Sequence, residues 1–249
     1  MNFFYLIFIL EHRSSSIQAL YIYTMDTNNL DNPVWQALSE THNSYAIEYD
    51  GVKFYNPEVC PFGGFTKIGK TKEAMESYSK ICDDFFIVGN HPIKPSTLTL
   101  DKTVICDQMV LSQLNQPEYT HSIEKLTEQH IDELYELVWL VMPGYFKKRT
   151  FEMGDYYGIF IDNTLAAVTG ERMQMNDYIE VSAVVTHPNH IRKGMAKQLV
   201  AYTSQRILEK NKIPILHVAQ KNTGAIKLYE KLGFKSIRKM TWRHYVKNS

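Results

Sequence analysis

Apolar and polar positions in residues 119–249 follow two periods, one typical of strands and one of helices. Ile179, Val181, Ala183 and Val185 alternate with Glu180, Ser182 and Val184, which is the period-2 mark of a strand. Apolar stripes at helical spacing predict helices that begin near residues 127, 194 and 222. Further strands are predicted at 122–126, 156–161, 165–169, 215–218 and 236–246. The order β-α-β-β-β-α-β-α-β predicts an α/β fold, in detail an α+β mixed sheet with helices on its faces.

Residues 31–118 carry a second α+β pattern. Asn32-Pro33 opens a short helix, and two strand-like runs at 45–49 and 52–55 flank an Asp50-Gly51 hairpin signal. Residues 61–65 are interpreted as a loop or tight turn, residues 74–81 as a helix, and 85–88 and 104–109 as strands joined by a connection over 89–103. This order suggests a degenerate copy of the C-terminal fold, packed beside it without an open phosphate loop.

The first thirty residues are left out of the predicted fold. Residues 1–10 are strongly apolar, but the run ends at Glu11-His12-Arg13, about half the length that a membrane-spanning helix needs. A basic segment and a clear cleavage site, which a signal peptide needs, are both missing. We therefore interpret 1–30 as an irregular leader, with a start near Met25, and divide the rest into 31–118 and 119–249. We expect no stable membrane association.

Composition and charge narrow the function classes. Hydrophobic residues make up 44% of the 249 and charged residues 22%, the balance of a soluble globular protein. The net charge of zero argues against a general nucleic-acid binder. Residues 190–249, however, hold 14 lysines and arginines against two glutamates, which favours an anionic ligand at this end. Three scattered cysteines without a CxxC motif indicate a reducing compartment, so we expect a cytoplasmic protein.

The stretch 180–196 combines a strand, a turn and the start of a helix, a typical place for a phosphate. The first turn of a helix leaves backbone N–H groups unpaired, and the helix dipole is positive there. Gly194 allows close approach of the backbone to an anion, and Arg192 and Lys193 add positive charge. A strand, a glycine turn and a helix alone also fit a purely structural connection.

A second segment makes the pattern specific. Residues 222–234 (NTGAIKLYEKLGF) follow one strand later, and together with 180–196 they resemble the acetyl-CoA-binding motifs of the GNAT superfamily of N-acetyltransferases. The runs 170–173 (GERM) and 180–188 (EVSAVVTHP) are similar to its FR47-like branch. The resemblance covers about residues 120–246.

The resemblance implies a binding site for acetyl-CoA and no need for a metal. Val184, Val185 and Thr186 match positions whose backbone binds pantetheine, in a gap between diverging strands. The positions that match the pyrophosphate loop and its flank are Ile191, Arg192, Lys193, Gly194, Met195, Ala196 and Lys197. The usual Gln or Arg of the motif is replaced by Ile191, which we expect to weaken binding. Asn222 matches a CoA contact and also fits a helix N-cap.

Two residues match catalytic positions. Tyr229 matches the general acid, and a phenol with a pKa of about 10 stays protonated at neutral pH; a core aromatic residue would fit the same helical spacing. Glu180 stands where some relatives keep a glutamate that acts as a base through water. We expect burial to raise its pKa, while an ion pair with Arg172 is an equal alternative. Glu171, His217 and the pair Tyr156-Tyr157 are weaker candidates.

The predicted function is direct transfer of an acetyl group to a primary amine of a small molecule or peptide, with the oxyanion held by a main-chain N–H near Val184 and Val185. One alternative is a glycine N-acyltransferase-like enzyme that uses another acyl-CoA or an amino acid acceptor. Another is a non-catalytic CoA-binding protein. No nucleic-acid partner is expected, and neither the acceptor nor the oligomeric state follows from the sequence.

Overall fold

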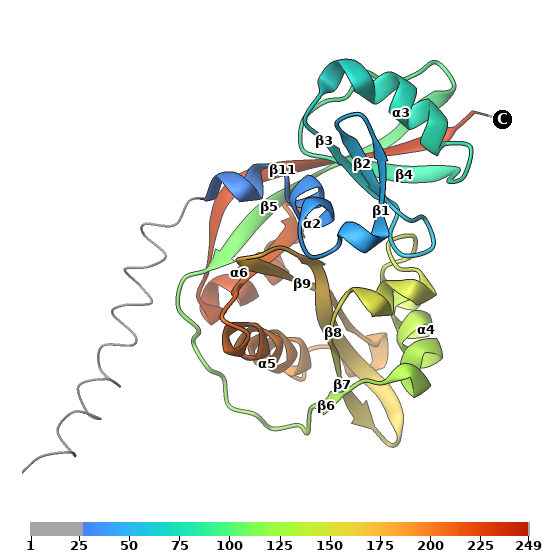
Figure 1. The fold of residues 1–249 in the computed structure, drawn as a ribbon. Coiled ribbons are helices and arrows are strands. Elements are labelled where there is room, and N and C mark those ends of the chain that lie inside the picture. Colours follow the sequence, from blue (N-terminus) through green and yellow to red (C-terminus); the bar gives the residue numbers. More distant parts are fainter. Residues whose placement is uncertain (1–26, 249) are drawn as a thin grey trace, which may run out of the picture.

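The computed structural model describes residues 27–248, and their strands form one mixed sheet of eleven strands (Figure 1). The strand order is β1-β2-β3-β4-β11-β5-β10-β9-β8-β7-β6. The strands are β1 (Ala46–Tyr49), β2 (Val52–Tyr55), β3 (Phe62–Phe65), β4 (Asp84–Val88), β5 (Leu98–Leu111), β6 (Glu124–Lys125), β7 (Tyr156–Ile161), β8 (Thr164–Gln174), β9 (Tyr178–Thr186), β10 (Ile213–Ala219) and β11 (Phe234–Lys247). The fold class predicted from the sequence is confirmed.

Within residues 27–248, five α-helices and six 3₁₀ turns accompany the sheet. The helices are α2 (Pro33–Ser39), α3 (Thr71–Tyr78), α4 (Ile131–Val141), α5 (Met195–Glu209) and α6 (Thr223–Leu232). The 3₁₀ turns are η1 (Thr27–Asp31), η2 (Asn43–Tyr45), η3 (Ile68–Lys70), η4 (Glu128–His130), η5 (Lys148–Met153) and η6 (Pro188–His190). Each α-helix overlaps its predicted range, because capping residues and apolar stripes are local signals. Helix α3 nevertheless begins and ends three residues before the predicted range 74–81, and Ile81 lies outside it and is exposed. Asn32 and Asn222, for example, both accept a backbone N–H as N-caps.

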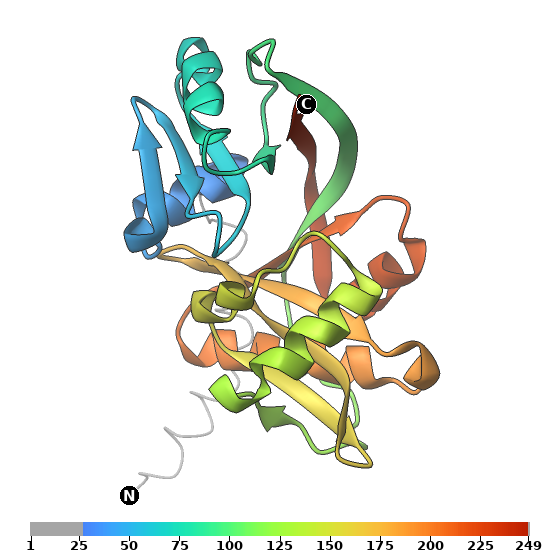
Figure 2. The ribbon, with the colours of Figure 1, turned by 90° about the vertical axis from the view of Figure 1, so that its right-hand side faces the viewer.

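The two halves of the chain exchange their last strands. β5, which ends the N-terminal half, lies between β10 and β11, and β11, which ends the C-terminal half, lies between β4 and β5. Outward from this central pair, successive strands pair in the same way on both sides. The order from β11 to β1 is antiparallel, parallel, antiparallel and antiparallel, and the order from β5 to β7 is the same. This arrangement supports the idea that the N-terminal half is a degenerate copy, and Figure 2 shows the two long strands running through both halves.

Residues 62–65 form β3, a buried strand in the interior of the sheet, so the prediction of a loop over 61–65 is wrong. β3 pairs with β2 on one side and β4 on the other. A Cβ on Gly63 would collide with the ring of Phe54, and one on Gly64 would lie 2.6 Å from Asn32 Oδ1. The two glycines therefore leave room for neighbouring side chains.

Three further boundaries differ from the sequence prediction. The strand predicted at 104–109 begins at Leu98, inside the predicted connection, because pairing along β11 extends it. The strand predicted at 122–126 shrinks to two residues. Leu30, placed in the leader, is fully buried in η1, and its carbonyl oxygen accepts a hydrogen bond from Gln108. The predictions for residues 1–26 lie outside the described residues, and no described helix is long and apolar enough to cross a membrane.

Candidate active site

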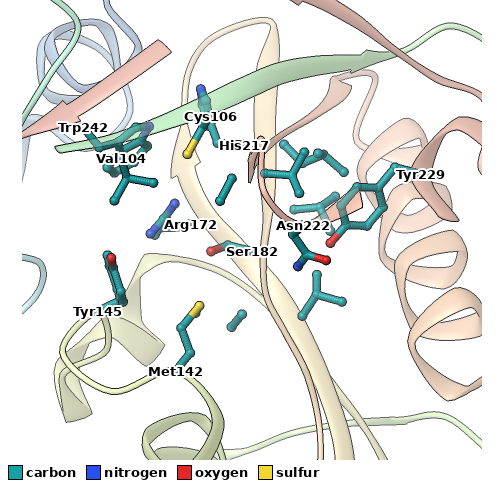
Figure 3. A pocket seen from close by; sticks show the side chains of 16 residues that line it. Val104, Cys106, Met142, Tyr145, Arg172, Ser182, His217, Asn222, Tyr229 and Trp242 are labelled. Carbon is teal, nitrogen blue, oxygen red and sulfur yellow. The ribbon is translucent and has the colours of Figure 1, made fainter. Parts of the chain in front are cut away.

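The site begins where β9 and β10 separate. The two strands pair in parallel over residues 178–180 and 213–215, and no pairing continues beyond Glu180 and Ile215. β9 nevertheless runs on to Thr186 and β10 to Ala219. The gap holds a pocket of about 330 Å³, lined on one side by residues 181–184 and on the other by residues 216–219 (Figure 3). The diverging strands expected from the sequence are thus present.

A bulge in β9 shapes this gap. Ala183 has a φ of +51°, and the register against β8 shifts there, so that Val168 faces Val185 while Gly170 faces Ser182. One extra residue on β9 therefore has no partner on β8, and main-chain groups near the bulge are released from the ladder. A positive φ is strained for alanine. Its position beside the pocket makes the strained backbone part of the site.

The bulge also changes which side chains face the helices. A regular strand would place residues 179, 181, 183 and 185 on one face. Instead Val181 packs in the cluster with α5 and α6, whereas Ala183 and Val185 pack in the cluster with α4. Val184 turns toward the α5 and α6 side and lines the pocket, whereas Val185 does not line it. The uninterrupted alternation inferred from the sequence is therefore wrong after residue 182.

A second pocket, of about 770 Å³, surrounds the start of α5. It is lined by Thr186 and by every predicted loop residue from Ile191 to Lys197, as well as by His190. Arg192 and Gly194 both have left-handed backbones, with φ of +63° and +78°. The N-cap Gly194 offers no side chain to the first amides of α5. A helix start of this kind suits an anion.

Gly194 is needed for its backbone angle. A Cβ on this residue would meet only Gln198 Nε2 of the protein, at 3.7 Å, which is an ordinary contact. The close approach of an anion to this backbone stays a prediction. At φ +78° an L side chain is strained, and glycine is not.

Helix α6 adds positive charge that the sequence analysis missed. Lys227 and Lys231 line the same pocket as Lys193 and Lys197. Their spacing of four residues puts both on one face of α6, and this signal was available in the sequence. The excess of positive charge in residues 190–249 thus converges partly on this pocket.

Asn222 joins the two pockets. Its Oδ1 accepts the N–H of Ala225 at 3.1 Å, so the residue is an N-cap, and it also lines both the gap and the pocket at α5. Both interpretations offered by the sequence therefore fit the structure. A ligand that passes Asn222 could occupy the two pockets together.

Tyr229 projects from α6 toward the gap, and its hydroxyl end lies near Asn222 in Figure 3. The side chain is 8% exposed and packs with Leu232 and Phe234, so it is a core aromatic residue as well as a pocket residue. Burial raises the pKa of the Tyr229 phenol to about 12. The phenol therefore stays protonated throughout the neutral range.

Glu180 lies at the closed end of the gap in a buried ion-pair network. Its oxygens accept hydrogen bonds from Arg172 Nε at 2.7 Å and Nη2 at 2.8 Å, and His217 Nδ1 lies 2.8 Å from Oε1. Burial alone would raise the pKa of Glu180, but the charge and hydrogen bonds of Arg172, with the hydrogen bond of His217, lower it to about 2. The expected rise in pKa is wrong, and the ion-pair alternative describes the observed contacts.

The tautomer of His217 follows from its second partner. Gln108 Nε2 lies 3.0 Å from His217 Nε2 and also donates to the carbonyl oxygen of Leu30. Because an amide nitrogen only donates, the imidazole Nε2 accepts and Nδ1 carries the proton toward Glu180. Both ring nitrogens are thus occupied.

The remaining candidates lie elsewhere. Tyr156 and Tyr157 are buried in two different core clusters and do not line the gap. Glu171, the other buried glutamate of this sheet, pairs with Lys210 Nζ at 2.6 Å outside the gap. Among the residues from 27 to 248, no cluster of histidine, cysteine or carboxylate side chains could hold a metal ion.

Comparisons with known proteins agree with this geometry. Residues 156–243 match the family model described as FR47-like protein, whereas no curated protein matches the chain. A crystal structure from Novosphingobium aromaticivorans, assigned to the GNAT family of acetyltransferases, is 26% identical with a TM-score of 0.81, over 89% of this chain and 100% of that one.

Two more distant structures share the fold. A GCN5-related N-acetyltransferase from Kribbella flavida is 14% identical with a TM-score of 0.61, over 87% of this chain and 94% of its own. A GCN5-related N-acetyltransferase-like protein from Streptococcus suis is 11% identical with a TM-score of 0.59, over 94% of this chain and 100% of its own. The match over residues 156–243 and the 26% identical structure show that the chain is similar to GNAT-family acetyltransferases of the FR47-like kind, and the two more distant structures show the same fold.

Proposed function

We propose that this protein transfers the acetyl group of acetyl-CoA directly to a primary amine. The observation that carries the proposal is that the pocket at α5 and the pocket between β9 and β10 share Asn222 in their linings. A pocket lined by four lysines and Arg192 fits a nucleotide diphosphate, and the gap between the diverging strands fits the thioester arm. The GNAT-family neighbour with 26% identity supports the same reaction class.

Different residues of the two pockets would bind different parts of acetyl-CoA. The amides of residues 191–196 would hold the diphosphate, with Lys193 and the two α6 lysines adding charge. The backbone of residues 184–186 would bind the pantetheine arm as an added strand does, because β10 no longer pairs with it. Ile191 is 54% exposed and contributes no charge, so main-chain donors have to supply most of the binding.

The reaction needs an attack, a stabilised oxyanion and a proton for the leaving group. The amine nitrogen would attack the thioester carbonyl carbon, and released main-chain N–H groups near the Ala183 bulge would stabilise the oxyanion. The C–S bond then breaks, and the sulfur takes the phenol proton of Tyr229. The nitrogen loses its proton to water, and Tyr229 is reprotonated, so that the products are an amide and free CoA.

Glu180 serves this scheme by position rather than as a base. Its low pKa and its contacts to Arg172 and His217 leave it poorly suited to take a proton at neutral pH. We therefore assign it the role of fixing Arg172 and His217 beside the gap. The amine then has to arrive in its neutral form.

The test is release of free CoA thiol by the purified protein with acetyl-CoA and primary amines. Tyr229→Phe removes one hydroxyl and should lower kcat about 100-fold or more, while acetyl-CoA binding by calorimetry stays within a few-fold. Tyr202→Phe, on α5 and outside the gap, is the matched control and should leave kcat unchanged. Equal turnover in Tyr229→Phe and wild type would remove Tyr229 from the acid role, and tight CoA binding without any turnover would favour the non-catalytic alternative.

A further inference from the structure

One end of the gap is built by parts of the chain that lie outside the acetyl-CoA motifs. Val104 and Cys106 come from β5, Trp242 from β11, and Met142 and Tyr145 from the loop after α4. In Figure 3 these side chains gather on the side of β9 that is opposite Tyr229 and Asn222. We name this group, with Arg172, the acceptor end of the pocket. Because Tyr229 marks the thioester side, the amine has to come from the acceptor end.

The charge at the acceptor end is already neutralised. Of the described residues that line the pocket, Arg172 is the only lysine, arginine or carboxylate, and its side chain is 11% exposed. Two aromatic rings lie against its guanidinium, whose central carbon is 4.8 Å from the ring centre of Phe62 and 5.4 Å from that of Trp242. Its Nε and Nη2 donate to Glu180. A carboxylate on the acceptor would therefore meet a buried glutamate and a cation that is already paired, and a second ammonium group would meet Arg172.

The walls of the acceptor end are mostly apolar and held in place. Trp242 is 4% exposed and is fixed edge-on by Phe62 at 4.9 Å and by His217 at 5.5 Å between ring centres. Tyr145 stacks on Phe86 at 5.1 Å. A cavity of about 150 Å³ can hold a benzene molecule. The pocket of about 330 Å³ therefore has room for an acetyl thioester end and a body the size of one ring.

We propose that the acceptor is a primary amine on an uncharged, apolar body of about one aromatic ring, recognised by Val104, Cys106, Met142, Tyr145 and Trp242. This inference rests on the proposed acetyl transfer and names its acceptor class. It also gives the N-terminal half a role, since β5 supplies part of the binding wall. Amino acid acceptors are disfavoured because their carboxylate would be buried without a free cation.

The experiment compares acceptors that differ by one group, with the full-length protein, acetyl-CoA and thiol release as the readout. 2-Phenylethylamine and phenylalanine share one body and differ in the α-carboxylate, and kcat/KM should favour the former at least ~100-fold. Along propylamine, butylamine and pentylamine, kcat/KM should rise about four-fold per methylene, the factor that corresponds to ~0.8 kcal/mol for each buried CH₂.

A pair of variants tests the wall itself. Val104→Phe fills the acceptor end and should lower kcat/KM for 2-phenylethylamine ten-fold or more while leaving ethylamine within about three-fold. Ile105→Phe makes the same kind of change one residue further along β5, on the opposite face, where Ile105 is 46% exposed, and should alter neither value. Calorimetry with CoA checks that both variants are folded.

The outcomes separate the two proposals. Preference for phenylalanine or glycine over the matched amines, or the absence of any gain along the alkylamine series, overturns the acceptor class and leaves acetyl transfer intact. Turnover with no amine of the panel refutes acetyl transfer and the acceptor class together. If Val104→Phe does not fold, the wild-type series alone decides.

Discussion

The buried pair of Glu180 and Arg172 gives the sharpest stability prediction. Glu180→Gln keeps the size of the side chain but removes the charge that balances Arg172. The pKa of Glu180 falls from 4.5 to about 2 on folding, a difference worth about 3 kcal/mol at neutral pH. Removal of one partner of a buried ion pair also costs roughly 3–5 kcal/mol. We therefore expect Glu180→Gln to lower the free energy of unfolding by about 3 kcal/mol.

The sign of the pH dependence follows from the same values. A carboxyl group whose pKa is lowered in the folded state stabilises the protein above its unfolded pKa, near 4.5 here, and the stabilisation is lost as the pH falls toward 2. The difference between wild type and Glu180→Gln, measured by urea unfolding, should therefore be largest above pH 5 and shrink below pH 4.

A matched control compares the loss of this buried ion pair with the loss of an exposed one. Glu152→Gln breaks a pair with Arg149 whose side chains are 42% and 44% exposed, and it should cost less than about 1 kcal/mol. Equal losses in the two variants, or a loss below 1 kcal/mol for Glu180→Gln at pH 7, would refute the argument that the network at the closed end of the gap is a buried, compensated pair.

Three other predictions concern binding, pH and cooperativity. Gly194→Ala should raise KM for acetyl-CoA about five-fold with kcat nearly unchanged, because an alanine in the left-handed backbone conformation costs about 1 kcal/mol. An unaltered KM in steady-state kinetics would contradict this. In the proposed scheme Glu180 does not act as a base, so the amine has to lose its proton in solution. For an alkylamine with a pKa of about 10.4, kcat/KM should therefore rise about ten-fold per pH unit from pH 7 to 9. A plateau near pH 7 would instead reveal a base on the enzyme. The exchanged strands β5 and β11 should make both halves unfold in one transition, followed by tryptophan fluorescence and far-UV circular dichroism, and two separate transitions would show that the halves are independent.

The acetyl-CoA side of the site could be predicted from the sequence because its signals are local. The strand, turn and helix start between residues 180 and 197 are contiguous, and Asn222 and Gly233 mark the two ends of α6 by capping. Each of these features depends on neighbours a few residues away. Their positions were therefore available before any tertiary contact was known.

The lowered pKa of Glu180 could not be predicted from the sequence in the same way. Its pKa depends on Arg172 across the β8 and β9 pair and on His217 across β10. The charge and hydrogen bonds of Arg172, with the hydrogen bond of His217, outweigh the effect of burial. The bulge at Ala183 was equally hidden, since its sequence alternates as a regular strand does. In both cases pairing with neighbouring strands decides the outcome, and the pairing is a property of the whole sheet.

The acceptor end shows why the N-terminal half matters for the chemistry. Its wall combines Cys106, Tyr145 and Trp242, which lie far apart in the sequence and meet only because β5 and β11 change places at the centre of the sheet. If each half kept its own last strand, β11 rather than β5 would lie beside β10, and Cys106 would leave the pocket. The strand exchange thus turns a half without a recognisable catalytic motif into a wall of the proposed binding site, so that changes in either half can alter which amine is accepted.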